Sequence, residues 1–246
     1  MMTWNPDDLA SNARPDLHRD LRKGVPEIII ADRKTVGQSL DIARRFLKAT
    51  GRAILSRVPA DLEERLRSEF AGQAELEWLP GPRAAVLRRL DLAAEPLDGG
   101  GRVGVLTAGT SDIPVAEEAA LVCREMGCEV NTVYDVGVAG LHRLWGPLRH
   151  LLDEAEIDVL IVAAGMDGAL PSVVSGLVDV PVIGLPTSVG YGLGGKGEAA
   201  LLSMLQTCSP GMAVVNIDNG VGAGAMAGLI ANRMAAARRG QNSAQG

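Results

Sequence analysis

Apolar and polar positions in the first hundred residues follow the spacings of a small α+β unit. Leu40, Ala43 and Leu47 recur at helical spacing, which predicts a helix over Val36–Thr50. A second helix is expected over Asp61–Phe70. Strands are expected at Glu27–Ala31, Ala74–Leu79 and Ala84–Leu90. None of these segments resembles a catalytic motif.

Beyond residue 101, short runs rich in Val, Ile and Leu alternate with helical patterns. Strands are expected at Arg102–Thr107, Glu129–Tyr134, Ile157–Ala163, Val180–Leu185 and Met212–Ile217. Helices are expected at Ile113–Met126, Leu141–Ala155, Ser172–Leu177, Gly197–Leu205 and Gly222–Ala237. Near-continuous apolar strands are typical of a sheet covered by helices on both faces. The alternation therefore predicts an α/β fold with a doubly wound parallel sheet.

Charge and glycine content divide the chain near residue 100. The first hundred residues hold sixteen basic and sixteen acidic side chains and seven glycines. Residues 101–246 hold eight basic and fourteen acidic side chains and twenty-three glycines. We therefore expect an N-terminal α+β domain over residues 1–95 and a flexible linker over 96–101 that contains Gly99-Gly100-Gly101. The α/β domain is expected over residues 102–240, followed by a flexible tail over 241–246.

Composition excludes several classes of protein. The formal net charge of -6 argues against a generic nucleic-acid binder. The first 25 residues lack the apolar core of a secretory signal, and the longest uncharged stretches, Val180–Gly195 and Asn219–Asn232, are too short and too interrupted to span a membrane. Three scattered cysteines suggest neither a disulfide framework nor a metal cage. We expect a cytoplasmic protein without a nucleic-acid or membrane partner.

Each predicted strand of the α/β domain runs directly into a polar, glycine-rich segment. These segments are Ala108–Asp112, Asp135–Arg143, Gly165–Gly168, Thr187–Gly192 and Asp218–Gly220. In open parallel sheets, ligands bind in the crevice at the carboxyl ends of the strands. We therefore expect the five segments to meet at one edge of the sheet and to form a ligand site.

The segment after the first of these strands suits a phosphate group. Backbone N–H groups at the start of the following helix, with the hydroxyls of Thr110 and Ser111, are able to hold an anion on the helix dipole. The alternative is that Ser111 or Asp112 only caps the helix.

Other polar residues in these segments also have two interpretations. His142 and Arg143 stand where they can meet a carboxylate or a phosphate, although a lone histidine is more often structural. Asp167 lies beside the expected crevice, where partial desolvation suits a carboxyl group to proton transfer. A turn-forming role is the alternative, and the same choice applies to Asp135 and Asp218.

The three cysteines differ in their settings. Cys123 and Cys128 fall in or just beyond a helical pattern and are expected in the core, because buried thiols behave as small hydrophobic groups. Cys208 leaves a helix into Ser209-Pro210-Gly211, so we expect its thiol to reach a pocket. A helix C-terminus disfavours a thiolate, so a nucleophilic Cys208 needs a cation or a cationic substrate beside it.

Four segments together carry a resemblance to a known family. They are Ala108–Asp112, Gly137–Arg143, Gly165–Pro171 and Asn216–Gly220. With them the chain resembles the LarB family, the nickel-pincer cofactor biosynthesis proteins of lactate racemase maturation, whose C-terminal domain is similar to the AIR carboxylases of purine synthesis. The match covers most of residues 101–237, and Pro26-Glu27 with Lys34-Thr35 continue it more weakly.

The resemblance implies a pyridinium-3,5-biscarboxylic acid mononucleotide synthase. Such an enzyme carboxylates ring C5 of nicotinic acid adenine dinucleotide and hydrolyses the phosphoanhydride to release AMP. Cys208 matches the family's nucleophile, and Asp167 stands where the family usually has Glu, in the role of the proton-transfer group. The implied substrate-binding residues are Gly109, Thr110, Ser111, Asp112, Asp135, Gly137, His142, Arg143, Gly165, Met166, Gly168, Ser188, Gly190, Asp218 and Asn219.

The resemblance also implies co-substrates and partners. Carbon dioxide or bicarbonate is the co-substrate, Mg²⁺ is expected for phosphoanhydride hydrolysis without identified ligands, and no tightly bound organic cofactor is expected. A homo-oligomer, an octamer in related enzymes, is expected, with Gly222–Ala237 as a packing surface. One alternative is an AIR carboxylase or mutase, and the presence of Cys208 and of the N-terminal unit argues against it. The other alternative is a non-catalytic nucleotide-binding module.

Overall fold

The computed structural model describes residues 13–92 and 99–243. The chain divides into two compact units, residues 1–95 and 96–246. Among the described residues, no helix combines the length and the apolarity needed to cross a bilayer.

The N-terminal unit is the expected α+β structure with two additional elements. Its helices are α1 (Arg19–Lys23), α2 (Val36–Thr50) and α3 (Ala60–Glu69), and its strands are β1 (Ile28–Ile30), β2 (Arg52–Ser56), β3 (Ala74–Leu79) and β4 (Ala84–Arg89). The sheet order is β1-β2-β4-β3, with β1 parallel to β2 and the other pairs antiparallel. The sequence pattern predicted neither α1 nor β2.

Helix α2 has the boundaries that its sequence predicts because both ends are capped locally. The Thr35 hydroxyl accepts from the backbone N–H of Gln38 at 3.2 Å, and the Gln38 side chain accepts from the N–H of Thr35 at 3.0 Å. Gly51 ends the helix in the left-handed conformation, at a φ of 75°. The buried face of α2, which includes Leu40 and Leu47, joins the core of this unit.

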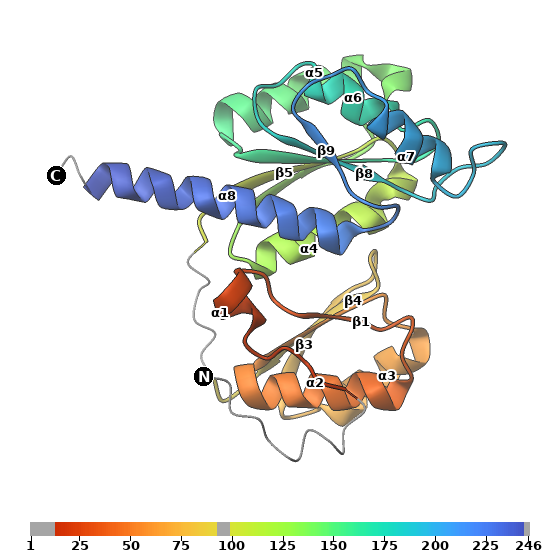
Figure 1. Ribbon diagram of the computed structural model, residues 1–246. Coiled ribbons are helices and arrows are strands. Elements are labelled where there is room, and N and C mark those ends of the chain that lie inside the picture. Colours follow the sequence, from red (N-terminus) through yellow and green to blue (C-terminus); the bar gives the residue numbers. More distant parts are fainter. Residues whose placement is uncertain (1–12, 93–98, 244–246) are drawn as a thin grey trace. The chain divides into compact units, whose positions relative to one another are not determined.

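The C-terminal unit is the expected doubly wound sheet. Its strands are β5 (Arg102–Thr107), β6 (Glu129–Val133), β7 (Val159–Ala164), β8 (Val182–Pro186) and β9 (Met212–Val214). Its helices are α4 (Ile113–Glu125), α5 (His142–Arg149), α6 (Ala169–Ser175), α7 (Glu198–Leu205) and α8 (Gly220–Ser243). The strand order is β6-β5-β7-β8-β9 and every pair is parallel. Helices α4 and α8 cover one face, and α5, α6 and α7 cover the other (Figure 1).

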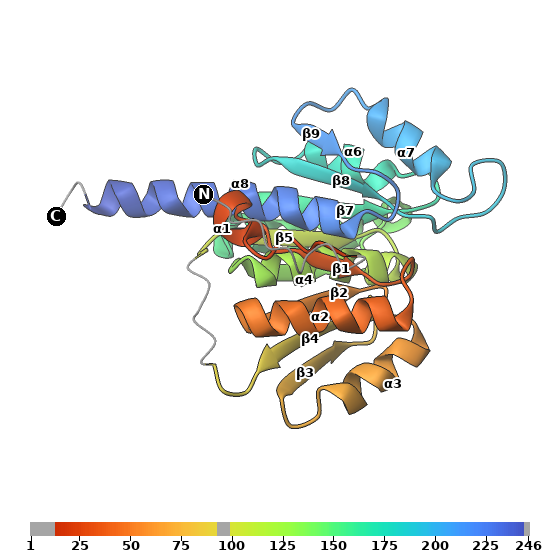
Figure 2. The same ribbon diagram turned by 60° about the horizontal axis from the view of Figure 1, so that its bottom comes forward.

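Helix α8 packs closely on α4 through glycines spaced four residues apart (Figures 1 and 2). A Cβ at Gly220 would lie 2.6 Å from the carbonyl oxygen of Val115, and one at Gly224 would lie 2.4 Å from that of Ala119. The small residues of α8 therefore pack within the chain. Met226 and Met234 of the same helix are exposed, and the expectation that Gly222–Ala237 forms a packing surface for assembly stays a prediction.

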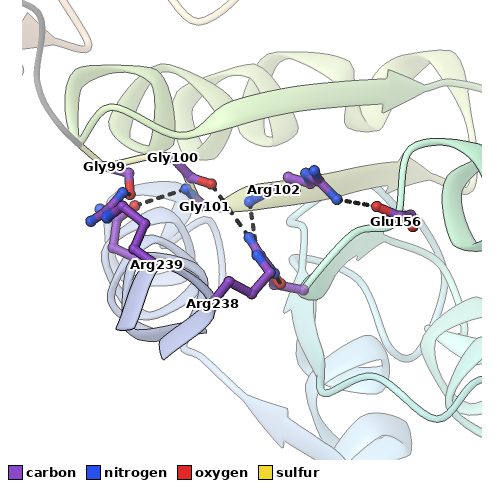
Figure 3. A network of polar contacts seen from close by, with 9 residues as sticks. Gly99, Gly100, Gly101, Arg102, Glu156, Arg238 and Arg239 are labelled. Atoms are coloured by element: carbon purple, nitrogen blue, oxygen red, sulfur yellow. Dashed lines mark hydrogen bonds and ion pairs between the residues drawn. The ribbon is translucent and has the colours of Figure 1, made fainter. Parts of the chain in front are cut away.

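The start of the α/β unit is fastened to the end of α8 (Figure 3). The N–H of Gly101 donates to the Asn232 side chain at 3.2 Å, and Arg239 donates to the carbonyl of Gly99 at 3.2 Å. Arg238 pairs with Asp158, whose carboxylate also accepts from the N–H of Arg102. These contacts hold Gly99–Gly101, which we expected to be part of the linker. They also involve Arg238 and Arg239, which lie beyond the expected end of the helix at Ala237.

Parts of the linker and the tail remain untested. Residues 96–98 of the expected linker and residues 244–246 of the expected tail lie outside the described residues. In the described part, Gly99–Gly101 are packed on α8, and residues 241–243 are helical. The structure therefore assigns these two segments to the packed α/β unit and to α8, whereas we expected linker and tail.

Substitution of Gly224 tests the contact between α4 and α8. Gly224→Ala should lower the free energy of unfolding by about 1–3 kcal/mol, because the new methyl group meets backbone that cannot rotate away. Gly240→Ala in the same helix meets nothing within 4 Å and should be neutral or stabilising by up to ~1 kcal/mol. Urea denaturation measures both changes, and equal stabilities for the two variants would contradict the packing described.

Candidate functional site

The candidate site lies where the order of the strands reverses. The chain runs from β5 outward to β6 and then crosses to the other side of β5 to form β7, β8 and β9. In this topology the ligand crevice opens between the carboxyl ends of the two strands that flank the reversal, here β5 and β7. The segments after these strands are those that the sequence singled out.

Hydrogen bonds and close packing join the segment after β6 to the end of β5. The Thr107 hydroxyl accepts from the N–H of Asp135 at 3.0 Å. Gly137 lies so near the following segment that a Cβ would approach the carbonyl oxygen of Ala108 to 2.6 Å. Arg143 donates to the Asp135 carboxylate at 2.7 Å, so Asp135 holds the arginine at this edge of the sheet.

The segments after β7, β8 and β9 are joined in the same way. The N–H of Met166 donates to the carbonyl of Val189 at 2.7 Å, and the N–H of Ser188 donates to the Asp218 carboxylate at 2.8 Å. Gly165 has no space for a side chain, because a Cβ would lie 2.2 Å from the Val189 oxygen. All five segments therefore meet at one edge of the sheet.

Three residues of these segments adopt the left-handed backbone conformation without being glycine. They are Asp135 at a φ of 58°, Met166 at 50° and Asp218 at 55°. This conformation costs a residue other than glycine roughly 1–2 kcal/mol, and such strain gathers at functional sites. Each of the three follows a strand, so the strain supports a functional role for this edge.

Asp112 lies at the centre of the edge and is buried, with 3% of its surface exposed. Its carboxylate accepts from the N–H of Gly109 at 2.8 Å and from the hydroxyl of Thr187 at 2.6 Å. Burial raises the pKa of the Asp112 carboxyl. The hydrogen bonds, including one from backbone at Gly165, lower that pKa, and the charge of Asp218 raises it further. Each oxygen of Asp112 thus accepts one hydrogen bond within the protein, and its expected role in substrate binding stays a prediction.

Several expected binding residues do face solvent at this edge. Thr110 and Ser111 are exposed in the 3₁₀ turn Thr110–Asp112, with His142 and Arg143 exposed at the start of α5. Their donors are available for an anionic ligand. Of the remaining expected residues, Met166, Ser188 and Gly190 are exposed, and Gly137, Gly165 and Gly168 are buried backbone positions.

Asp167 and Asn219 have partners at the starts of helices. Asp167 is exposed, and its carboxylate accepts weakly from the N–H of Ala169 at 3.3 Å. The single chain therefore does not give Asp167 the desolvation that we expected. Asn219 accepts from the N–H of Gly222 at 2.9 Å and caps α8, and its expected role in substrate binding stays a prediction.

Cys208 is exposed, but it lies at the other edge of the sheet. It precedes β9, whose first residue Met212 pairs with Val182, the first residue of β8. Ser209 donates to the carbonyl of Ser172 in α6 at 2.8 Å, which fixes this segment beside α6. A strand of five residues spans roughly 16 Å. A single chain therefore does not bring Cys208 to the crevice, contrary to our expectation.

Cys123 and Cys128 are buried, as predicted. The Cys123 thiol lies 3.4 Å from the carbonyl oxygen of Gly224 in α8, and burial raises its pKa strongly. Burial likewise raises the pKa of Cys128 to about 11. Neither thiol is therefore suited to nucleophilic chemistry at neutral pH.

The described residues do not form a dedicated metal cage, since no three His, Cys, Asp or Glu side chains among them group as ligands. The donor set therefore does not fit a Mg²⁺ ion held by the protein alone.

Two buried threonines are part of the site, and the sequence reasoning overlooked them. Thr107 and Thr187 are fully buried, and their hydroxyls bind Asp135 and Asp112. Thr107 ends strand β5, and Thr187 directly follows strand β8. A hydroxyl residue at the end of an apolar run is therefore the sequence signal that could have identified both.

The comparisons with known proteins agree with this architecture. The family model for AIR carboxylase matches residues 102–245, and the model for the LarB/PurE-like N-terminal domain matches residues 7–88. An uncharacterised protein of Methanocaldococcus jannaschii is 40% identical over 230 residues, which cover 93% of this chain and 87% of that protein.

Two further matches concern the C-terminal unit. The N5-carboxyaminoimidazole ribonucleotide mutase of the same organism is 34% identical over 125 residues, which cover 50% of this chain and 74% of the mutase. The crystal structure of Treponema denticola PurE matches with a TM-score of 0.43 at 18% identity, covering 58% of this chain and 94% of that one. From the matched models and the similarity to the Methanocaldococcus protein, the chain belongs to the AIR carboxylase family and carries a LarB/PurE-like N-terminal domain.

Proposed function

We propose that this protein carboxylates C5 of the pyridinium ring of nicotinic acid adenine dinucleotide and hydrolyses its phosphoanhydride to release AMP. The observation that carries the proposal is the presence of both domains on one chain, a LarB/PurE-like domain over residues 7–88 and an AIR carboxylase domain over 102–245. The mutase named above matches 50% of this chain, so that activity leaves the N-terminal domain without a role.

The crevice offers donors for the anionic groups of such a substrate. The hydroxyls of Thr110 and Ser111 and the side chains of His142 and Arg143 are exposed at one edge of the sheet. Because the whole chain carries a net charge of -6, the anion must be bound by local groups of this kind. The ion pair with Asp135 holds Arg143 in place for this task.

The chemistry needs a nucleophile, because C5 of a pyridinium ring is too electron-poor to attack carbon dioxide. A thiolate that adds to the ring forms a C–S bond and leaves an enamine, in which C5 is nucleophilic. C5 then forms a C–C bond with carbon dioxide and loses its proton to a base. Expulsion of the thiolate breaks the C–S bond and restores the aromatic ring. One proton is released for each carboxylate added.

Asp167 is the proposed acceptor of the C5 proton. It lies in the segment after β7, beside the reversal of the strand order, and it is exposed toward solvent. Its side chain is one methylene shorter than the glutamate of the resemblance, so a bridging water molecule completes its reach. Binding of the substrate over Asp167 would supply the desolvation that the single chain lacks.

Cys208 is the proposed nucleophile, and the geometry favours a second copy of the chain as its source. The adduct requires the thiolate and Asp167 at the same ring, whereas the length of the sheet separates them within one chain. We therefore propose a homo-oligomer in which Cys208 of a second copy reaches the crevice. A cytoplasmic setting suits this role, because the thiol must stay reduced.

Turnover of the proposed substrate tests the function. Purified protein given nicotinic acid adenine dinucleotide, labelled bicarbonate and Mg²⁺ should release AMP and a labelled biscarboxylated mononucleotide, detected by mass spectrometry. Carboxylation of aminoimidazole ribonucleotide alone would assign the protein to purine synthesis instead. Binding without turnover of either compound would favour a regulatory module.

Mixed oligomers test the origin of the nucleophile. Cys208→Ala should lower incorporation of label at least ~10³-fold and Asp167→Asn by about 10²–10⁴-fold, because each removes one reacting group. Co-expression of the two variants in equal amounts should restore about a quarter of wild-type activity, since about one site in four then holds both intact residues.

Three outcomes of that experiment would contradict the scheme. Normal turnover by Cys208→Ala would exclude the covalent step, and normal turnover by Asp167→Asn would exclude its proton-transfer role. Failure of the mixture to recover, with subunit exchange verified by two affinity tags, would exclude a shared site. Gln206→Ala is the matched control, since it alters an exposed side chain two residues before Cys208 and should keep wild-type activity.

A further inference from the structure

Basic side chains gather at one edge of the sheet in the N-terminal unit. Strands β1 and β2 are parallel, and their last residues, Ile30 and Ser56, pair with each other. Strand β4 runs antiparallel to β2, so its start lies at the same edge (Figure 2). Arg33 and Lys34 follow β1, and Arg83 directly precedes β4. These three cations therefore stand on segments within two strand spacings of each other, about 10 Å between backbones.

Two of these side chains are held against the backbone. The Lys34 ammonium donates to the carbonyl of Ile30 at 2.8 Å, and Nε of Arg83 donates to the carbonyl of Val58 at 3.1 Å. Arg57, on the segment between them, has contacts of its own. Lys34 is half-buried and Arg83 is exposed, so each keeps further N–H donors that a ligand can reach. Because the side chains are already restrained, binding loses little of their conformational entropy.

The three cations have no ion-pair partner among the residues that the structure describes. Asp32, the acidic residue in the segment after β1, is exposed and forms no ion pair with them. Asp61, at the start of α3, accepts from the N–H of Leu62 at 3.0 Å. Elsewhere in this unit arginines do find carboxylates, as Arg67 does with Glu63 at 2.9 Å. The edge therefore keeps an excess of positive charge, although residues 1–100 hold equal numbers of basic and acidic side chains.

Solvated surface charges alone do not explain this arrangement. A lysine or arginine on a surface normally extends into water, which preserves its rotamer freedom and keeps like charges apart. Here the backbone carbonyls of Ile30 and Val58 restrain two cations on neighbouring segments. Arg83 also adopts the left-handed backbone conformation, at a φ of 50°, which is uncommon for residues other than glycine. A bound anion would remove the repulsion between the cations and accept hydrogen bonds from both.

We propose that Arg33, Lys34 and Arg83 form a binding site for a phosphate monoester at this edge of the N-terminal unit. A phosphate monoester carries about two negative charges at neutral pH and three acceptor oxygens, which match a guanidinium fork together with an ammonium group. A single carboxylate carries one charge and would leave the positive charge of the edge partly unbalanced. The inference does not depend on the proposed function, although the AMP released in that reaction is a phosphate monoester.

Binding of AMP without turnover tests the site, measured by titration calorimetry in a full-length Arg143→Ala background that weakens the crevice. Lys34→Gln and Arg83→Gln each remove a positive charge but keep an N–H donor for the backbone carbonyl. Each should weaken AMP binding about tenfold, and the two together about a hundredfold, because each removes a charged hydrogen bond to the phosphate. Lys48→Gln is the matched control, since it removes an exposed lysine from the last turn of α2 and should bind AMP unchanged.

Hydrogen exchange locates the bound AMP. In the same background, AMP should slow amide exchange in residues 31–38 and 80–83, which carry the three cations. Adenosine, which lacks the phosphate group, should leave exchange in these segments unchanged. Inorganic phosphate that protects them as well as AMP does would support the site and confine recognition to the phosphate group.

Three results would overturn the proposal. The first is undiminished AMP binding by the variant that combines Lys34→Gln with Arg83→Gln. The second is protection by adenosine equal to that by AMP. The third is protection of these segments by a polyglutamate peptide but not by AMP, which would assign the edge to an acidic protein segment. A protein that does not turn over the dinucleotide refutes the proposed function and leaves these binding results to decide the inference.

Discussion

The parallel pairing of all five strands in the C-terminal unit is the constraint on which the rest depends. Parallel strands enter from one edge and leave at the other, so every segment that follows a strand gathers on one side. The same constraint sends every segment that precedes a strand to the opposite side. Parallel pairing therefore places the crevice at one edge of the sheet and Cys208 at the other. The covalent mechanism proposed above then needs a second copy of the chain to supply Cys208.

Elements with local signals could be predicted closely from the sequence. Helix α2 has a capping box and a terminal glycine, and strands β3 and β5 have the expected boundaries. Strand β2 was missed because only one residue, Gly51, separates it from α2, and its pairing with β1 and β4 fixes it through distant contacts. The last turns of α8 likewise depend on contacts with Gly99 and Gly100, more than a hundred residues away.

Local sequence signals predicted some features of the candidate site, whereas contacts between distant residues determine the others. Glycine-rich segments after apolar strands are visible in the sequence, and the structure brings all five together. The pairing of Asp112 with Thr187 is not visible, because it joins residues on different strand ends. Cys208 was misplaced for a related reason: its motif suggested a reactive thiol, whereas the order of helix and strand around it decides the edge on which it stands.

The fastening of Gly99–Gly101 to the end of α8 brings the entry and the exit of the α/β unit to one place. A module closed on itself in this way does not depend on its neighbour to secure its ends. Fusion of an upstream domain, or its loss in evolution, then leaves the sheet and its crevice undisturbed. The α/β unit can therefore fold in the same way with different domains joined upstream of Gly99.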